Sequence, residues 1–127
     1  MKSYHNLSDR LISFAVSMIT VADQLPKNIG GCHLARQLTR SGSSPALQYG
    51  EAQSAESRSD FIHKMKIAVK ELRETYNCLK IIDKLDWLKE HNIHAEQTEC
   101  NELISIFVKS ISTAQKNRST EKTQQSC

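Results

Sequence analysis

Apolar residues recur at intervals of three and four along most of the chain, the spacing that places them on one face of an α-helix. We predict helices over residues 8–25, 32–55 and 96–115, and between them a long helix that begins after Ser57 or Ser59. Alternation typical of β-strands is absent from the sequence. The apolar stripes are Leu7, Leu11, Ala15, Met18, Ala22 and Leu25 in the first helix, Leu34, Leu38, Ser41, Pro45, Tyr49 and Ala52 in the second, Phe61, Met65, Ala68, Leu72, Tyr76 and Leu79 in the third, and Leu103, Ile104, Phe107, Val108, Ile111 and Ala114 in the fourth.

The middle of the second segment leaves two structures open. Residues 41–45 include Gly42 and Pro45 and resemble a turn, which would divide the segment into two short helices. One long helix with a kink is equally compatible, because small residues let neighbouring helices approach closely.

Four amphipathic helices joined by short polar breaks predict an all-α fold, an antiparallel up-down four-helix bundle over residues 1–115. The last segment, KNRSTEKTQQSC, is polar and lacks apolar periodicity, so we predict a disordered tail over residues 116–127. A length of 127 residues suits one domain, and four glycines and two prolines are few enough to favour helices over a turn-rich β-fold.

Two features bear on the cellular compartment. Residues 11–22, LISFAVSMITVA, look like part of a signal peptide, but Asp9 interrupts the basic flank and the run is too short to span a bilayer. We interpret it as a core helix and predict no membrane association. The four cysteines, Cys32, Cys78, Cys100 and Cys127, are far apart and indicate free thiols in a reducing cytoplasmic compartment.

The charge distribution indicates one candidate binding surface. Seventeen Lys and Arg residues against fourteen Asp and Glu give a net charge of +3, which permits an anionic partner without requiring one. Cations recur on the third helix opposite its apolar stripe, over about 27 Å. This candidate RNA or DNA contact comprises Lys66, Lys70, Arg73, Lys80 and Lys84, with Asn77 between them.

Alternatives for these cations stay open. Arg36 and Arg40 on the second helix could widen the candidate nucleic-acid surface, or could pair with carboxylates. The third-helix cations could equally form a solvated or intersubunit ion-paired face, with Glu74 beside Lys70 and Asp83 beside Lys80.

Other reactive side chains do not form a recognisable catalytic or metal site. A di-iron site in a helix bundle needs two Glu-x-x-His motifs in addition to carboxylates, and the sequence contains none. Roles in ion pairs and helix caps explain the carboxylates better. A structural zinc site needs four ligands, and His91, His94 and Cys100 supply three. We predict no enzymatic activity, no metal and no cofactor. The carboxylates considered are Glu51, Glu56, Asp60, Glu71 and Glu74.

Four short motifs within residues 37–79 carry a family resemblance. They are Arg40-Ser41-Gly42-Ser43-Ser44, Gln48-Tyr49-Gly50-Glu51-Ala52, Ala55-Glu56-Ser57-Arg58-Ser59-Asp60-Phe61 and Lys70-Glu71-Leu72-Arg73-Glu74-Thr75. Together they resemble the small four-helix-bundle proteins encoded by intervening sequences of 23S rRNA genes. The sequence departs from the family pattern at Gln48, where Asn is usual, and at Cys78, where many members have Trp.

The resemblance implies a ring-shaped homopentamer with no known enzymatic activity. A related group, the accessory variability proteins of diversity-generating retroelements, binds nucleic acid and a reverse transcriptase. Two hypotheses follow for this chain: a nucleic-acid-associated accessory or adaptor protein, and a scaffold that binds a protein partner. In a homo-oligomer, we expect some isoleucines beside the apolar stripes to face a neighbouring subunit, namely Ile12, Ile19, Ile62, Ile67 and Ile81.

Overall fold

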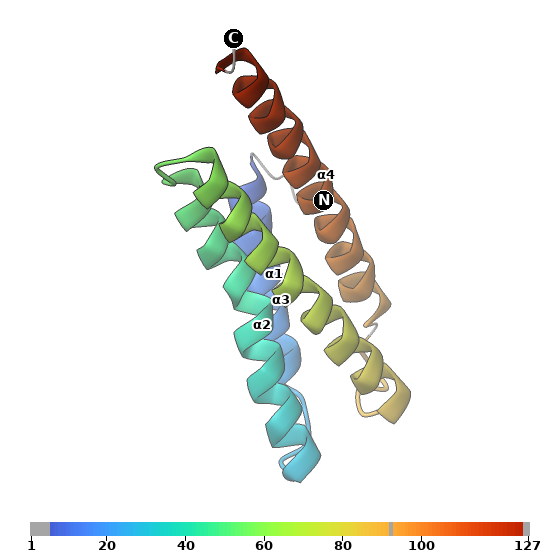
Figure 1. Ribbon diagram of the computed structural model, residues 1–127. Coiled ribbons are helices and arrows are strands. Elements are labelled where there is room, and N and C mark those ends of the chain that lie inside the picture. Colours follow the sequence, from blue (N-terminus) through green and yellow to red (C-terminus); the bar gives the residue numbers. More distant parts are fainter. Residues whose placement is uncertain (1–5, 92, 126–127) are drawn as a thin grey trace.

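The computed structural model describes residues 6–91 and 93–125, with side chains described as far as residue 117. It contains four helices, α1 (Leu7–Asp23), α2 (Ile29–Gln53), α3 (Arg58–Leu85) and α4 (His94–Gln125), which Figure 1 shows. No β-strand occurs within the described ranges. The predicted all-α fold with four helices is confirmed.

The helices are packed in chain order. Helix α2 lies against both α1 and α3, whereas α4 packs mainly against α3 and touches α1 lightly. The chain reverses direction at each connection, so consecutive helices lie side by side (Figure 1). The guanidinium of Arg10 joins α1 to α4 through ion pairs of 2.6 Å with both Glu99 and Glu102.

Polar side chains define where three helices begin. The side chains of Asn6, Asn28 and Ser57 each accept a hydrogen bond from a backbone N–H in the first turn, at 2.8, 2.7 and 3.0 Å. Such caps satisfy N–H groups that have no partner within the helix. Of the two serines proposed to cap the third helix, Ser57 is the cap. Helix α3 ends at Leu85 and is capped by Asp86, which adopts the left-handed conformation with φ 56°.

The two structures left open for the second segment are resolved in favour of one continuous helix. Pro45 lies inside it and is buried, although a proline has no N–H to donate to the carbonyl of Ser41. A small residue in the same stretch lets α2 lie close to its neighbour. Gly42 packs so closely on α1 that an added Cβ would lie 2.6 Å from Cβ of Met18.

The N-terminal apolar run is a core helix, as predicted. Its inward side chains are buried among those of the other helices, and the core extends through all four of them. None of the helices in the described part of the chain combines the length and apolar character needed to span a membrane. The buried residues of α1 are Leu11, Phe14, Met18, Val21 and Ala22.

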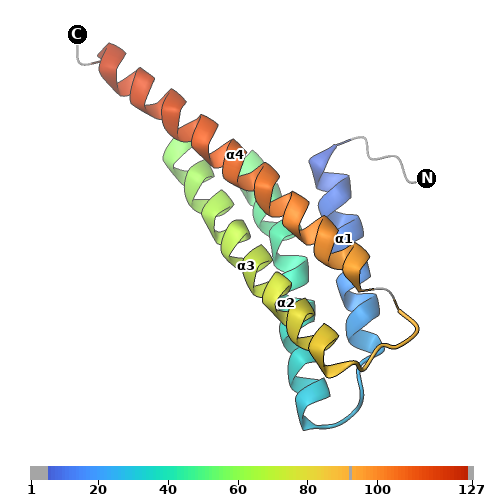
Figure 2. The same cartoon turned by 90° about the vertical axis from the view of Figure 1, so that its right-hand side faces the viewer.

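Helix α4 differs from the prediction at both ends. It begins at His94 and continues to Gln125, beyond the predicted end at Gln115. Residues 116–125, expected to be disordered, contain no Gly or Pro and include helix-favouring Lys, Arg, Glu and Gln, so nothing in them terminates a helix. Figure 2 shows this part extending past the ends of the other helices. Residues 126–127 of the expected tail lie outside the described residues, and the domain division at residue 115 stays a prediction.

Candidate nucleic-acid interface

The structure places the candidate cations of α3 on one outward line, which we call the basic stripe. All of them are exposed, and Asn77 is exposed between them. The opposite side of α3 holds the core residues Met65, Leu72 and Leu79, so the stripe faces away from the bundle. The basic stripe comprises Lys66, Lys70, Arg73, Lys80 and Lys84.

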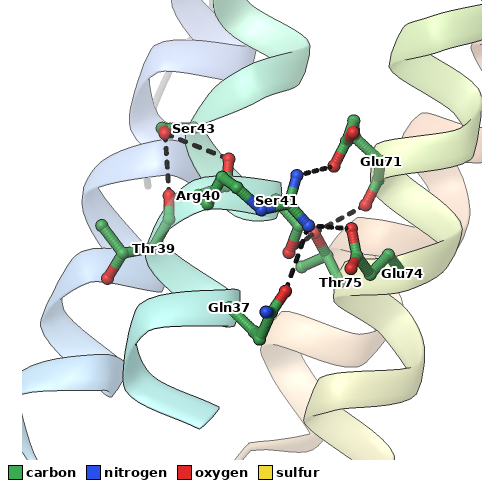
Figure 3. Close-up of polar contacts among 8 residues, drawn as sticks. All are labelled: Gln37, Thr39, Arg40, Ser41, Ser43, Glu71, Glu74 and Thr75. Carbon is green, nitrogen blue, oxygen red and sulfur yellow. Dashed lines mark hydrogen bonds and ion pairs between the residues drawn. The ribbon is translucent and has the colours of Figure 1, made fainter. Parts of the chain in front are cut away.

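Arg40 lies on α2 between two carboxylates of α3 (Figure 3). Its Nη1 donates to Oε2 of Glu71 at 2.8 Å, and its Nη2 donates to Oε2 of Glu74 and, at 3.1 Å, to Oε1 of Gln37. Hydrogen bonds from Arg40 lower the pKa of Glu74, and the two carboxylates raise the pKa of Arg40. Of the two roles left open for Arg40, the structure shows the carboxylate pairing.

This pairing determines which cations of the basic stripe have partners. Glu74 bonds to Arg40 rather than to Lys70, and Asp83 forms no ion pair with Lys80 within the described residues. Lys80 instead lies over the ring of Tyr76, 5.6 Å from its centroid, where a cation is weakly attracted. Among the side chains that the structure describes, none of the five cations of the stripe takes part in an ion pair.

A groove of about 640 Å³ runs between α2 and α3 beside the stripe. Lys70 and Asn77 form part of one wall, and His33 and Gln37 of α2 form part of the other. The sequence analysis did not single out His33 and Gln37. Both precede Arg40 at helical spacing, and this spacing is the signal that could have identified them. Arg36 is exposed on α2 but does not line this groove, so the structure does not bring it into the stripe.

The motifs that carried the family resemblance hold α2 and α3 together. The first and last of them meet: Arg40 pairs with Glu71 and Glu74, and Ser41 hydrogen-bonds to Thr75 (Figure 3). In the second motif, the ring of Tyr49 lies 5.8 Å from that of Phe107. The third motif supplies the α3 cap. These contacts hold the bundle together, whereas Lys70 and Arg73 of the fourth motif are exposed and belong to the basic stripe.

The remaining candidate groups are dispersed. Glu51 pairs with Lys64 at 3.5 Å, and Asp60 lies in the first turn of α3, where a negative charge suits the helix dipole. Nε2 of His91 lies 2.8 Å from Oε1 of Glu96, whereas Nδ1 of His94 lies 3.0 Å from Oε1 of Gln97. The described residues contain no group of three or more His, Cys, Asp or Glu placed to hold a metal ion.

The three described cysteines are free. Burial raises the pKa of the Cys78 thiol, and it raises that of Cys100 to about 12. Cys100 donates a hydrogen bond of 3.2 Å to the carbonyl of Leu72. Reactive cysteines need a lowered pKa, so Cys78 and Cys100 are structural residues. Cys127 lies outside the described residues.

The fold and the site define a small all-α bundle protein with an unpaired cationic face. The family model of the 23S rRNA-intervening sequence proteins matches residues 6–109, and this chain belongs to that family. A crystal structure of a protein of unknown function from the S23 ribosomal protein family of Bacteroides thetaiotaomicron is similar, with a TM-score of 0.77 and 26% identity over 84% of this chain and 98% of that one. No curated protein matches the chain. Neither the family name nor the description of this neighbour states an enzymatic activity.

Proposed function

We propose that this protein is a non-enzymatic, homo-oligomeric accessory protein that binds the phosphate backbone of RNA or DNA through the basic stripe of α3. One observation carries the proposal: Arg40 engages Glu71 and Glu74, two carboxylates of α3 that would otherwise be available to the stripe. The cations of the stripe therefore remain exposed and without ion pairs in the described residues.

An anionic partner would relieve a repulsion built into α3. Lys66 and Lys70 are four residues apart, as are Lys80 and Lys84, and like charges at this spacing each destabilise a helix by about 0.2–0.5 kcal/mol. Phosphates placed along the stripe remove that repulsion and release condensed counterions. Tyr76 is an aromatic residue beside the stripe, and the ammonium of Lys80 already lies over its ring. Base stacking therefore contributes little, and binding should be nearly independent of sequence.

Assembly into a ring would repeat the basic stripe around one particle, and we include a homopentamer in the proposal on the strength of the family resemblance. Three of the five isoleucines expected to face a neighbour are exposed, Ile12, Ile19 and Ile81, at 53%, 41% and 48%. Ile62 is buried within the bundle and is not available for such a contact, whereas Ile67 is half-buried. Free thiols at three cysteines support a reducing, cytoplasmic location.

Removal of two cations from the centre of the basic stripe tests the proposal. The variant Lys70→Ala/Arg73→Ala should bind RNA and DNA more weakly than the wild type does, and the loss of affinity should be about the same for unrelated sequences. Gel shifts with a random duplex and a random single strand measure this loss. Both side chains are exposed, so thermal unfolding of the variant should match that of the wild type.

A matched control separates the stripe from net charge. Lys27→Ala/Lys89→Ala removes two exposed cations elsewhere and should leave binding almost unchanged. Equal losses in the two variants, or no loss in either, would refute the assignment of the stripe. Retention of binding in Lys70→Ala/Arg73→Ala would favour the alternative, a scaffold for a protein partner.

A further inference from the structure

Helix α1 has a second apolar face that the bundle does not cover. Ile12, Val16 and Ile19 are 53%, 59% and 41% exposed, and their spacing places them on one line of about 10 Å. We call this line the α1 apolar stripe. Between Ile12 and Ile19 the sequence carries no charged residue. Charges follow towards the ends of the stripe, at Asp9 and Asp23, whereas Arg10 forms ion pairs with Glu99 and Glu102 of α4. An apolar line depleted of charge is typical of the core of a protein interface.

A groove of about 800 Å³ lies between α4 and the turn that joins α2 to α3, and we call it the α4 groove. It extends along α4 from Ile106 to Asn117, about 16 Å. Figure 2 shows α4 passing the upper end of α3 here. The apolar part of its lining comprises Ala52, Ala55, Phe61, Ile106 and Ala114.

We infer that the α1 apolar stripe of one copy of this chain docks in the α4 groove of a second copy. The inference rests on the proposed homo-oligomer and names the two surfaces that would form it. The groove is longer than the stripe, so it can accept all three aliphatic side chains. It also lies apart from the basic stripe, which stays open to nucleic acid in the assembly.

Charge favours this pairing over a two-fold contact between two α1 helices. In a two-fold contact centred on Val16, Asp9 of each helix would lie near Asp23 of the other, and like charges across an interface are unfavourable. The charged residues that line the α4 groove are Glu56, Arg58 and Lys109, which are of both signs, so the groove does not set like charges alone against the acidic ends of the stripe. The acidic ends of the α1 apolar stripe therefore suit the groove better than a second α1.

Different surfaces on the two partners make the contact head-to-tail, the type of contact that generates closed rings. Two variants break it from opposite sides. Ile12→Ser/Val16→Ser makes the α1 apolar stripe polar, and Ser110→Arg/Thr113→Arg fills the α4 groove. Each should give a light-scattering mass of 14.4 kDa, that of one chain, where the wild type gives a multiple of it.

Matched controls carry the same chemical changes elsewhere. Ile29→Ser/Val108→Ser removes two exposed aliphatic side chains, and Asn101→Arg/Ser105→Arg adds two cations to the outer side of α4. Both controls should keep the wild-type mass. Circular dichroism should show the same helix content and melting temperature for all four variants, because the substituted residues are not buried in the core.

Mixing the two interface variants is the decisive step. One retains the groove and the other retains the α1 apolar stripe, so a head-to-tail contact predicts a heterodimer of twice the single-chain mass by sedimentation, although each variant alone is monomeric. Two monomers that do not associate would overturn the inference. An oligomeric Ile12→Ser/Val16→Ser variant would overturn it while leaving the homo-oligomer intact, whereas a monomeric wild type would overturn both.

Discussion

The hydroxyl of Thr75 lies 2.9 Å from the hydroxyl of Ser41 across the contact between α3 and α2, and both side chains are fully buried. Thr75 also lies within hydrogen-bond distance of the carbonyl of Glu71, at 2.8 Å. The bond therefore satisfies two polar groups in an otherwise apolar core. It aligns the two helices next to the position where Arg40 meets its carboxylates, because Ser41 follows Arg40 and Thr75 follows Glu74 in the sequence (Figure 3).

Loss of one partner in this bond should destabilise the fold. Thr75→Val keeps the shape of the side chain but leaves the buried hydroxyl of Ser41 without its partner on α3. We expect the free energy of unfolding in urea to fall by about 1–3 kcal/mol. The double variant Ser41→Ala/Thr75→Val removes both polar groups and should recover part of that loss. A double variant as unstable as the sum of the two single variants would contradict the coupling.

Gly42 should not tolerate a methyl group. An added Cβ would lie 2.6 Å from both Cβ and Cγ of Met18, so Gly42→Ala forces α1 and α2 apart and should lower the free energy of unfolding by about 1–3 kcal/mol. Gly50 is the matched control, because nothing lies within 4 Å of its added Cβ. Gly50→Ala should stabilise α2 by about 0.5–1 kcal/mol. An equal change in the free energy of unfolding of the two variants would contradict close helix packing at Gly42.

The Arg40 ion pairs should make stability depend on pH in acid. Arg40 holds the pKa of Glu74 below its ordinary value of 4.5 in the folded state. A lowered folded-state pKa stabilises the fold above the unfolded pKa, and this contribution is lost as the pH falls through the folded-state pKa. Arg40→Met should therefore lower stability at pH 7, by at most about 1 kcal/mol because these groups are partly exposed. The difference from wild type should shrink below pH 4.5.

Lys70→Met is the control for this titration. Lys70 affects the pKa of Glu74 less than Arg40 does, so its removal should change the acid dependence less. Urea midpoints measured at pH 7 and pH 3 for both variants decide the matter. A stability difference for Arg40→Met that persists unchanged at pH 3 would show that the ion pairs do not cause it.

The buried thiols should resist modification in the folded protein. With a pKa near 12, Cys100 is almost entirely protonated at pH 8, and its sulfur is enclosed by the core. In a Cys127→Ser background, a chromogenic disulfide reagent should react first with the partly exposed Cys32 and with Cys100 only after unfolding. The added substitution Cys32→Ser should remove the fast phase. A fast reaction of Cys100 in the native protein would contradict its burial.

Periodicity predicted the helices and the outward direction of the basic stripe, because both depend on residues close together in the chain. The ion-pair partners of the charged residues were harder to predict from the sequence. Within one helix, Lys70 and Glu74 are at a favourable spacing for pairing, yet Glu74 bonds to Arg40, which is 34 residues away in sequence. Only the packing of α2 against α3 brings these two residues together.

Local composition was a weaker guide where the structure depends on tertiary contacts. Residues 41–45 resemble a turn, yet packing against Met18 and Thr75 stabilises a continuous helix there. Residues 116–125 lack an apolar stripe and were predicted to be disordered, but α4 continues through them because a polar sequence with good helix propensity needs no buried face to extend an existing helix.

The salt dependence of wild-type binding tests the central claim most directly. If three cations of the basic stripe contact phosphates, the slope of log K against log salt concentration should be about −2 to −3 for each subunit engaged. Fluorescence anisotropy with a labelled random-sequence duplex, titrated at a series of salt concentrations, measures that slope. A slope in this range, unchanged for a second unrelated sequence, is the result we predict. Affinity that does not change with salt would contradict phosphate binding by α3.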